Sequence, residues 1–134
     1  MKMFIVLFLV GSLAVNFLIA QKNNEQIKFS SNAKKNLIIA LNSDITGLKR
    51  SAVYFAGYYK IQEAVNPLVK LLNSASIDLS LKTLAAYSLH QIGDKECLDA
   101  LKKAANYSND KRLCSKCKLM YEDLIQEKSG VVYQ

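Results

Sequence analysis

The chain has 134 residues, which limits it to one small domain, although that length can still bury an adequate core without a disulfide framework. Its net charge of +7 at pH 7 is spread along the sequence, and only two of the 18 basic residues are arginine, Arg50 and Arg112. This pattern is typical of a solvated lysine-rich surface and argues against a nucleic-acid partner.

The N-terminal segment, residues 1–20, has the order of a targeting sequence. Lys2 precedes two apolar stretches, the second of which ends at Ala20, and a polar sequence begins directly afterwards. This order predicts a secretory signal peptide over residues 1–20, cleaved after Ala20, and an exported protein that is periplasmic or secreted. The alternative is an uncleaved anchor, because the segment is just long enough to cross a hydrocarbon layer of about 30 Å. We expect membrane contact only in that case, and we interpret residues 21–32 as a polar linker.

Beyond the linker, apolar residues recur at intervals of three and four, which predicts helices throughout and no strands. When the sequence is moved along itself until Leu48 lies over Leu81, residues 48–73 align with residues 81–106, with eight identical pairs. The period, about 33 residues, is typical of stacked helical hairpins. Turn-forming residues divide the helical region at positions 42–44, 73–76, 93–94 and 106–110.

Each repeat unit has the same pattern of apolar residues. Its first helix carries a face that we expect to be buried: Leu48, Ala52, Phe55 and Tyr59 in one copy, and Leu81, Ala85, Ser88 and Ile92 in the other. Its second helix carries Val65, Leu68 and Leu72 in one copy, and Leu98, Leu101 and Ala105 in the other. Tyr54 and Tyr87 also repeat in register, and we expect them to pack between adjacent hairpins.

These units resemble the HEAT repeat family, especially the short bacterial type that is similar to the phycobilin-lyase (PBS lyase) HEAT-like repeats. The resemblance rests on residues 48–53 and 64–72 in one copy and on residues 81–89, 92–94 and 98–101 in the other. It implies an all-α fold, a short right-handed α-α superhelix of antiparallel helix pairs, over residues 33–128, followed by a tail at 129–134. The flanks 36–43 and 113–124 match parts of a unit, so we expect a half, two whole units and a half. Asn109 or Asp110 would cap the last helix.

The second helices of HEAT-like stacks line the concave side, so their exposed residues are candidates for binding. The repeat aligns Lys70 with Lys103 on this side, and Lys102, Asn66 and Asp99 lie nearby in the sequence. Such a row could hold an acidic peptide or glycan. Lysine is also the commonest residue on a solvated helix face, which is the simpler interpretation.

Cysteine supplies the other candidate chemistry. Cys114 and Cys117 lie in the first turns of the last predicted helix, where the helix dipole and Lys116 favour the thiolate. A Cys114–Cys117 disulfide is one candidate and a Cys97–Cys117 bridge is a second, but Cys117 also falls on a face expected to be buried, where cysteine acts as a small hydrophobe. A zinc site that adds His90 is disfavoured because His90 lies opposite the apolar face of its helix. We therefore predict no metal and no cofactor.

No convincing catalytic set can be assembled, because the chain has a single histidine and no phosphate-binding glycine loop. We predict a binding or scaffold module that is not an enzyme and that acts through a protein partner of unknown identity. Two alternatives stay open. One is a thiol redox or metal-linked protein that uses Cys97, Cys114 and Cys117, and the other is an accessory, lyase-like protein that handles a prosthetic group.

Overall fold

The computed structural model describes residues 29–130, and this part of the chain is entirely helical, with no strand. The elements are α2 (Ser31–Leu41), α3 (Thr46–Tyr58), the short 3-10 helix η1 (Gln62–Ala64), α4 (Val65–Asn73), α5 (Leu79–Ile92), α6 (Lys95–Tyr107) and α7 (Lys111–Ser129). The expected all-α fold is therefore confirmed for residues 29–130. The predicted signal peptide, residues 21–28 of the linker and residues 131–134 of the tail lie outside the described residues.

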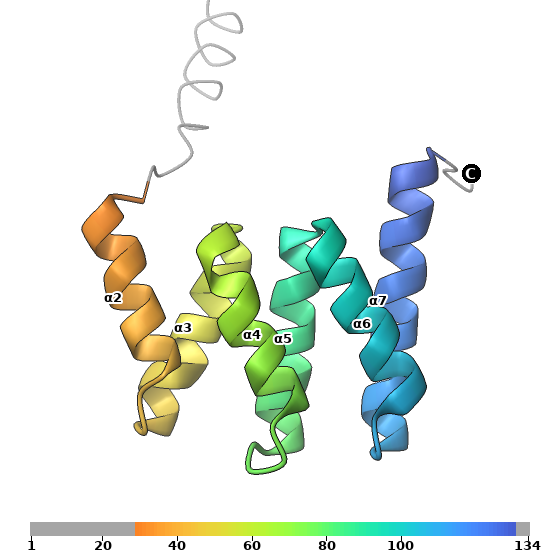
Figure 1. Cartoon of the computed structure of the whole chain (residues 1–134), viewed down its shortest axis with the longest axis horizontal. Helices are drawn as coiled ribbons and strands as arrows, with labels where there is room; N and C mark the ends of the chain where they lie inside the picture. Colours follow the sequence, from red (N-terminus) through yellow and green to blue (C-terminus); the bar gives the residue numbers. More distant parts are fainter. Residues whose placement is uncertain (1–28, 131–134) are drawn as a thin grey trace, which may run out of the picture.

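The helices form two layers of a stack (Figure 1). Helices α2, α4 and α6 make one layer, and α3, α5 and α7 make the other. Neighbours pack closely in the layer of α3, α5 and α7, whereas α2 and α4 in the other layer make few contacts with each other. Between the layers the closest pairs are α2 with α3, α4 with α5, and α6 with α7. Helices α3 and α4, by contrast, make few close contacts, so each second helix packs mainly on the first helix of the following unit. The sequence predicted half a repeat unit, two whole units and another half unit. In the structure the same helices form three close pairs, because the repeat period gives the spacing of the helices but not which neighbours pack most closely.

The observed elements follow the repeat period. Helix α3 begins at Thr46 and α5 at Leu79, and η1 with α4 covers the positions that α6 covers in the next unit. The corner after each first helix also repeats. Lys60 has a φ angle of 50°, and Gly93, at the equivalent position of the next unit, has a φ angle of 70°. No turn-forming residue occurs at 59–61, so the first of these corners was not predicted.

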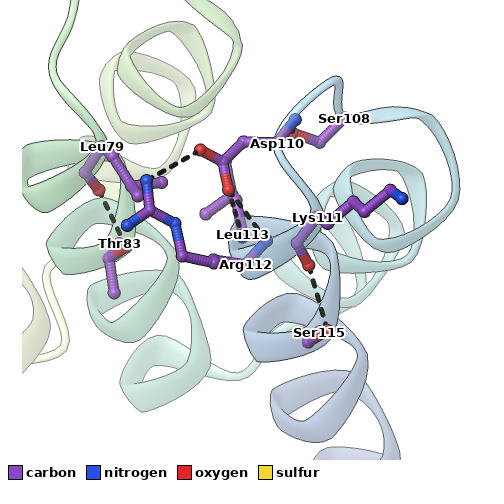
Figure 2. Close-up of polar contacts among 8 residues, drawn as sticks. All are labelled: Leu79, Thr83, Ser108, Asp110, Lys111, Arg112, Leu113 and Ser115. Carbon is purple, nitrogen blue, oxygen red and sulfur yellow. Dashed lines mark hydrogen bonds and ion pairs between the residues drawn. The ribbon is translucent and has the colours of Figure 1, made fainter.

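Side chains cap four of the helices. Ser30, Asp78 and Asp94 each accept a hydrogen bond from a backbone N–H in the first turn of α2, α5 and α6. Of the two caps that the sequence offered for α7, Asn109 and Asp110, the structure has Asp110: its Oδ1 accepts from the N–H groups of Arg112 (2.8 Å) and Leu113 (3.2 Å), and Figure 2 shows both bonds. The Arg112 guanidinium lies 3.5 Å from the other carboxylate oxygen. These caps fix where the helices begin.

The expected buried face of the first helix is found in the second unit, where Leu81, Ala85, Ser88 and Ile92 all lie in the core. In the first unit the prediction was wrong for two residues, because Leu48 and Phe55 are exposed. Helix α3 instead buries a face of small residues, Ala52, Val53, Ala56 and Gly57.

This small-residue face permits a close approach of α3 and α5. A Cβ atom added to Gly57 would lie 2.7 Å from the Cα of Ser88, far inside normal contact distance. At the same place the Ser88 hydroxyl, which is buried, donates a hydrogen bond of 2.7 Å to the carbonyl oxygen of Val53. The two helices are therefore joined by a contact that leaves no room for a side chain at position 57.

We expect Gly57→Ala to destabilise the fold by about 1–3 kcal/mol, because the methyl group can be accommodated only if α3 and α5 move apart. Gly47→Ala is the matched control, since Gly47 lies in the same helix and a Cβ there would meet nothing within 4 Å. That variant should be unchanged or more stable by up to about 1 kcal/mol, from helix propensity. Urea unfolding followed by circular dichroism measures both. Equal effects of the two substitutions would contradict the close contact.

Lys60→Gly should stabilise the protein by about 0.5–1 kcal/mol. Lys60 occupies the left-handed region, which costs an L-residue about 1–2 kcal/mol, and glycine avoids that cost at the expense of unfolded-state entropy. The backbone bonds Lys60 N–H to Gly57 O and Ile61 N–H to Ala56 O would remain, as in other helix ends of this kind. Thermal unfolding of Lys60→Gly beside Gly93→Lys tests this, and the second variant should lose stability. A less stable Lys60→Gly variant would show that contacts of the lysine side chain stabilise this corner by more than its left-handed backbone conformation costs.

Candidate functional site

Exposed apolar side chains recur at one region of the repeat on the layer of α3, α5 and α7. Tyr54 is 48% exposed, Tyr87 is 47% exposed and Leu119 is 67% exposed. The two tyrosines occupy the same repeat position, and Leu119 directly precedes the next such position. We call these three residues the apolar stripe. The sequence suggested that both tyrosines pack between adjacent hairpins, but about half of each residue is exposed, so neither is enclosed between them.

Aromatic residues widen the apolar stripe at α3. The rings of Tyr54 and Tyr58 stack with centroids 5.9 Å apart, and Phe55 meets Tyr54 edge-on at 5.4 Å. Phe55 also stacks on Tyr59, which in turn packs against Phe29 at 4.6 Å. Neighbouring aromatic rings hold one another in place, so this part of the surface is ordered before any partner arrives.

On α5 the apolar stripe is supported by a polar contact to α7. The ring of Tyr87 stacks on the ring of His90 with centroids 6.3 Å apart, and His90 Nε2 lies 2.7 Å from Asp123 Oδ2. The other ring nitrogen, Nδ1, is buried and has no hydrogen-bond partner among the described residues. A shallow groove of about 480 Å³ separates α5 from α7 here and joins Tyr87 to Leu119. The groove brings Tyr87 and Leu119 to one hollow, whose lining also includes Met120 and the polar residues Glu122, Asp123 and Gln126.

The five binding residues expected on the second helices, Asn66, Lys70, Asp99, Lys102 and Lys103, are all exposed. The Lys102 ammonium lies 5.9 Å from the centre of the Tyr121 ring, toward α7. Lys103 lines a separate cavity with Lys82, and Lys70 is not part of that lining. The repeat register alone does not show which neighbours each of these side chains meets.

The three cysteines are free thiols, and neither of the two candidate disulfides is formed. Cys97 and Cys117 are buried, whereas Cys114 is partly exposed and its thiol donates to the carbonyl oxygen of Ser108 at 3.1 Å. Burial, followed by a hydrogen bond to Asp94, raises the pKa of Cys97 to about 12. Burial and the nearby Cys114 raise the pKa of Cys117 to about 11. For Cys117 this is opposite to the thiolate that the helix position suggested, because loss of solvent outweighs the helix dipole.

Neither metal binding nor membrane crossing finds support in the described helices. Between residues 29 and 130, no three His, Cys, Asp or Glu side chains are grouped so that they could hold a metal ion. His90 faces Asp123, not the cysteines. No helix in the same range combines the length and the apolar composition needed to cross a membrane.

Two layers of antiparallel helices with one repeat period define an α-helical repeat protein. Within that class, the family model of the PBS lyase HEAT-like repeat matches residues 82–107, which are nearly all of α5 and the whole of α6. This match confirms the resemblance to HEAT-like repeats in the second unit, where the predicted apolar face is also buried. A search of curated proteins found no match to the chain.

Thiol titration of the folded protein should detect one rapidly reacting cysteine, Cys114. At pH 8 a thiol with a pKa of about 12 is ionised in about one molecule in ten thousand, and burial blocks access as well. Ellman's reagent should therefore label one thiol in the native state and three in urea, and Cys114→Ser should remove the native reaction. Rapid native reaction of Cys97 or Cys117 would support thiol chemistry instead.

Proposed function

We propose that this protein is a binding module that recognises an amphipathic helix of a partner protein through the apolar stripe. The observation that carries the proposal is the repeated exposure of Tyr54, Tyr87 and Leu119, one from each helix of the same layer. Isolated exposed apolar residues are normal on protein surfaces, but apolar residues at one region of successive repeats lie on the same face of the stack, where one partner can contact them together.

The spacing of the helices supports a helical partner. Packed helices lie about 8–10 Å apart, so three successive stripe residues span about 20 Å. A helix rises about 1.5 Å per residue, and its residues i, i+7 and i+14 are therefore about 10 Å apart on one face. A helix also satisfies its own backbone hydrogen bonds. An extended strand would need an exposed sheet edge, and residues 29–130 provide none.

The thiols support a binding role over redox chemistry, because two of the three are buried with raised pKa values. Export through residues 1–20 and a right-handed twist of the stack belong to the proposal as well. If the protein is exported, its partner is a protein of the cell envelope or the extracellular medium.

Replacing Tyr87 and Leu119 with serine should weaken partner binding by about tenfold to a hundredfold, since central apolar anchors carry most of the energy of an interface. A photo-crosslinking residue at position 119 first captures the partner from envelope extract, and purified segments of that partner are then titrated by calorimetry. Tyr107→Ser is the matched control, because Tyr107 is 78% exposed but lies on α6, in the other layer.

Two results would overturn the proposal. One is a Tyr107→Ser variant that loses as much affinity as the double variant while both remain folded. The other is crosslinking at position 119 that joins only two copies of this chain, with a dimer of the same stoichiometry in light scattering.

A further inference from the structure

A second candidate site lies at the lower edge of the stack in Figure 1, where the loops after α4 and α6 meet the starts of α5 and α7. Here a cavity of about 450 Å³ opens between the elements. Pockets for small molecules have volumes of about 300–1,000 Å³, so its size is adequate for a ligand. The apolar stripe does not contribute to its lining.

One buried residue in the lining of the cavity is smaller than its repeat equivalent. Ala104 lines it, whereas the equivalent position of the first unit holds Leu71, and both side chains are buried. Leucine fills space that alanine leaves open. Leu72 and Leu113 complete an apolar wall beside Ala104.

Two lysines contribute to the lining of the same cavity. Lys82 comes from the first turn of α5 and Lys103 from α6, and neither forms an ion pair with another described residue. Lys82 is partly buried, which strengthens its interaction with a bound charge compared with a fully solvated lysine.

The cavity lining also contains one carboxylate, Asp110, which already has hydrogen-bond and ion-pair partners. Asp110 caps α7 and lies beside the Arg112 guanidinium (Figure 2), and hydrogen bonds from the Leu113 and Arg112 N–H groups lower the pKa of its side chain. The Arg112 charge and the positive end of α7 offset its negative charge locally. The two lysines therefore leave the cavity with an unbalanced positive charge.

We propose that this cavity binds a small organic anion, with a carboxylate or phosphate group between Lys82 and Lys103 and an apolar part against Leu72, Ala104 and Leu113. Both anionic groups accept hydrogen bonds from ammonium donors, and each such bond is stronger than one between neutral groups. The apolar wall adds affinity for the remainder of the molecule. This site does not depend on the apolar stripe, so either proposal can fail without the other.

Three small aromatic molecules can test this proposal. Benzoate and phenyl phosphate carry the two anionic groups on the same ring, and benzamide is the neutral equivalent. Titrations followed by amide chemical shifts at constant ionic strength should show saturable binding of at least one anion near α5, α6 and the 108–110 loop. Benzamide should bind at least about tenfold more weakly, the loss expected from removing a charged hydrogen bond. The anion that binds more tightly identifies which group the site prefers.

Lys103→Met should weaken anion binding about tenfold, and Lys70→Met, its repeat equivalent outside the cavity, should leave it unchanged within about twofold. Ala104→Leu, which restores the residue of the first unit, should abolish binding in a protein that still unfolds cooperatively. If Ala104→Leu does not fold, the two lysine variants decide. Equal binding of benzamide, equal losses in both lysine variants, a folded Ala104→Leu protein that still binds, or no saturable binding at all would overturn the proposal.

Discussion

The contact between Gly57 of α3 and Ser88 of α5 is the constraint on which the stack depends. It brings two backbones so close that a Cβ at Gly57 would lie 2.7 Å from the Ser88 Cα, and the Ser88 hydroxyl donates to the Val53 carbonyl oxygen. A buried hydroxyl without such a partner would cost about 1–3 kcal/mol. The contact therefore fixes both the separation and the rotation of the two helices, because only one rotation of α5 directs Ser88 at that carbonyl.

That rotation determines which side chains remain outside. With small residues closing the space between α3 and α5, the large rings that neighbour them in sequence must lie on the outer face of the layer. Tyr54 and Phe55 adjoin the buried Val53 and Ala56, and Tyr87 adjoins the buried Ala86 and Ser88. Helix α7 continues the surface because Leu113, Cys117 and Leu124 bury its opposite face. The exposed apolar stripe is thus a geometric consequence of close packing beneath it.

The sequence predicts the helices, the period and the second-unit core well, because burial at Leu81, Ala85 and Ile92 follows helical spacing. It fails where the outcome depends on a neighbour that the period does not specify. Leu48 is identical to Leu81, yet it is exposed because only α2 precedes its helix among the described elements. The turn at Lys60 lacks any glycine, proline or asparagine. The cavity was not predicted either, because the difference between Ala104 in its lining and the equivalent Leu71 gains a structural meaning only once both positions are known to be buried.

The same packing places the two candidate sites, the apolar stripe and the cavity, at separate parts of this small domain. Both candidate sites use α5 and α7, the apolar stripe through Tyr87 and Leu119 and the cavity through Lys82 and Leu113. Helix α7 is placed by its Asp110 cap at one end, by buried Cys117 in the middle and by the Asp123–His90 contact further along. Cys117 is therefore best understood as a residue that packs, since its burial both holds α7 and raises its pKa to about 11. Rigid placement of α7 lets a domain of three helix pairs present ordered surfaces, because the site residues on it lose little conformational entropy when a ligand binds.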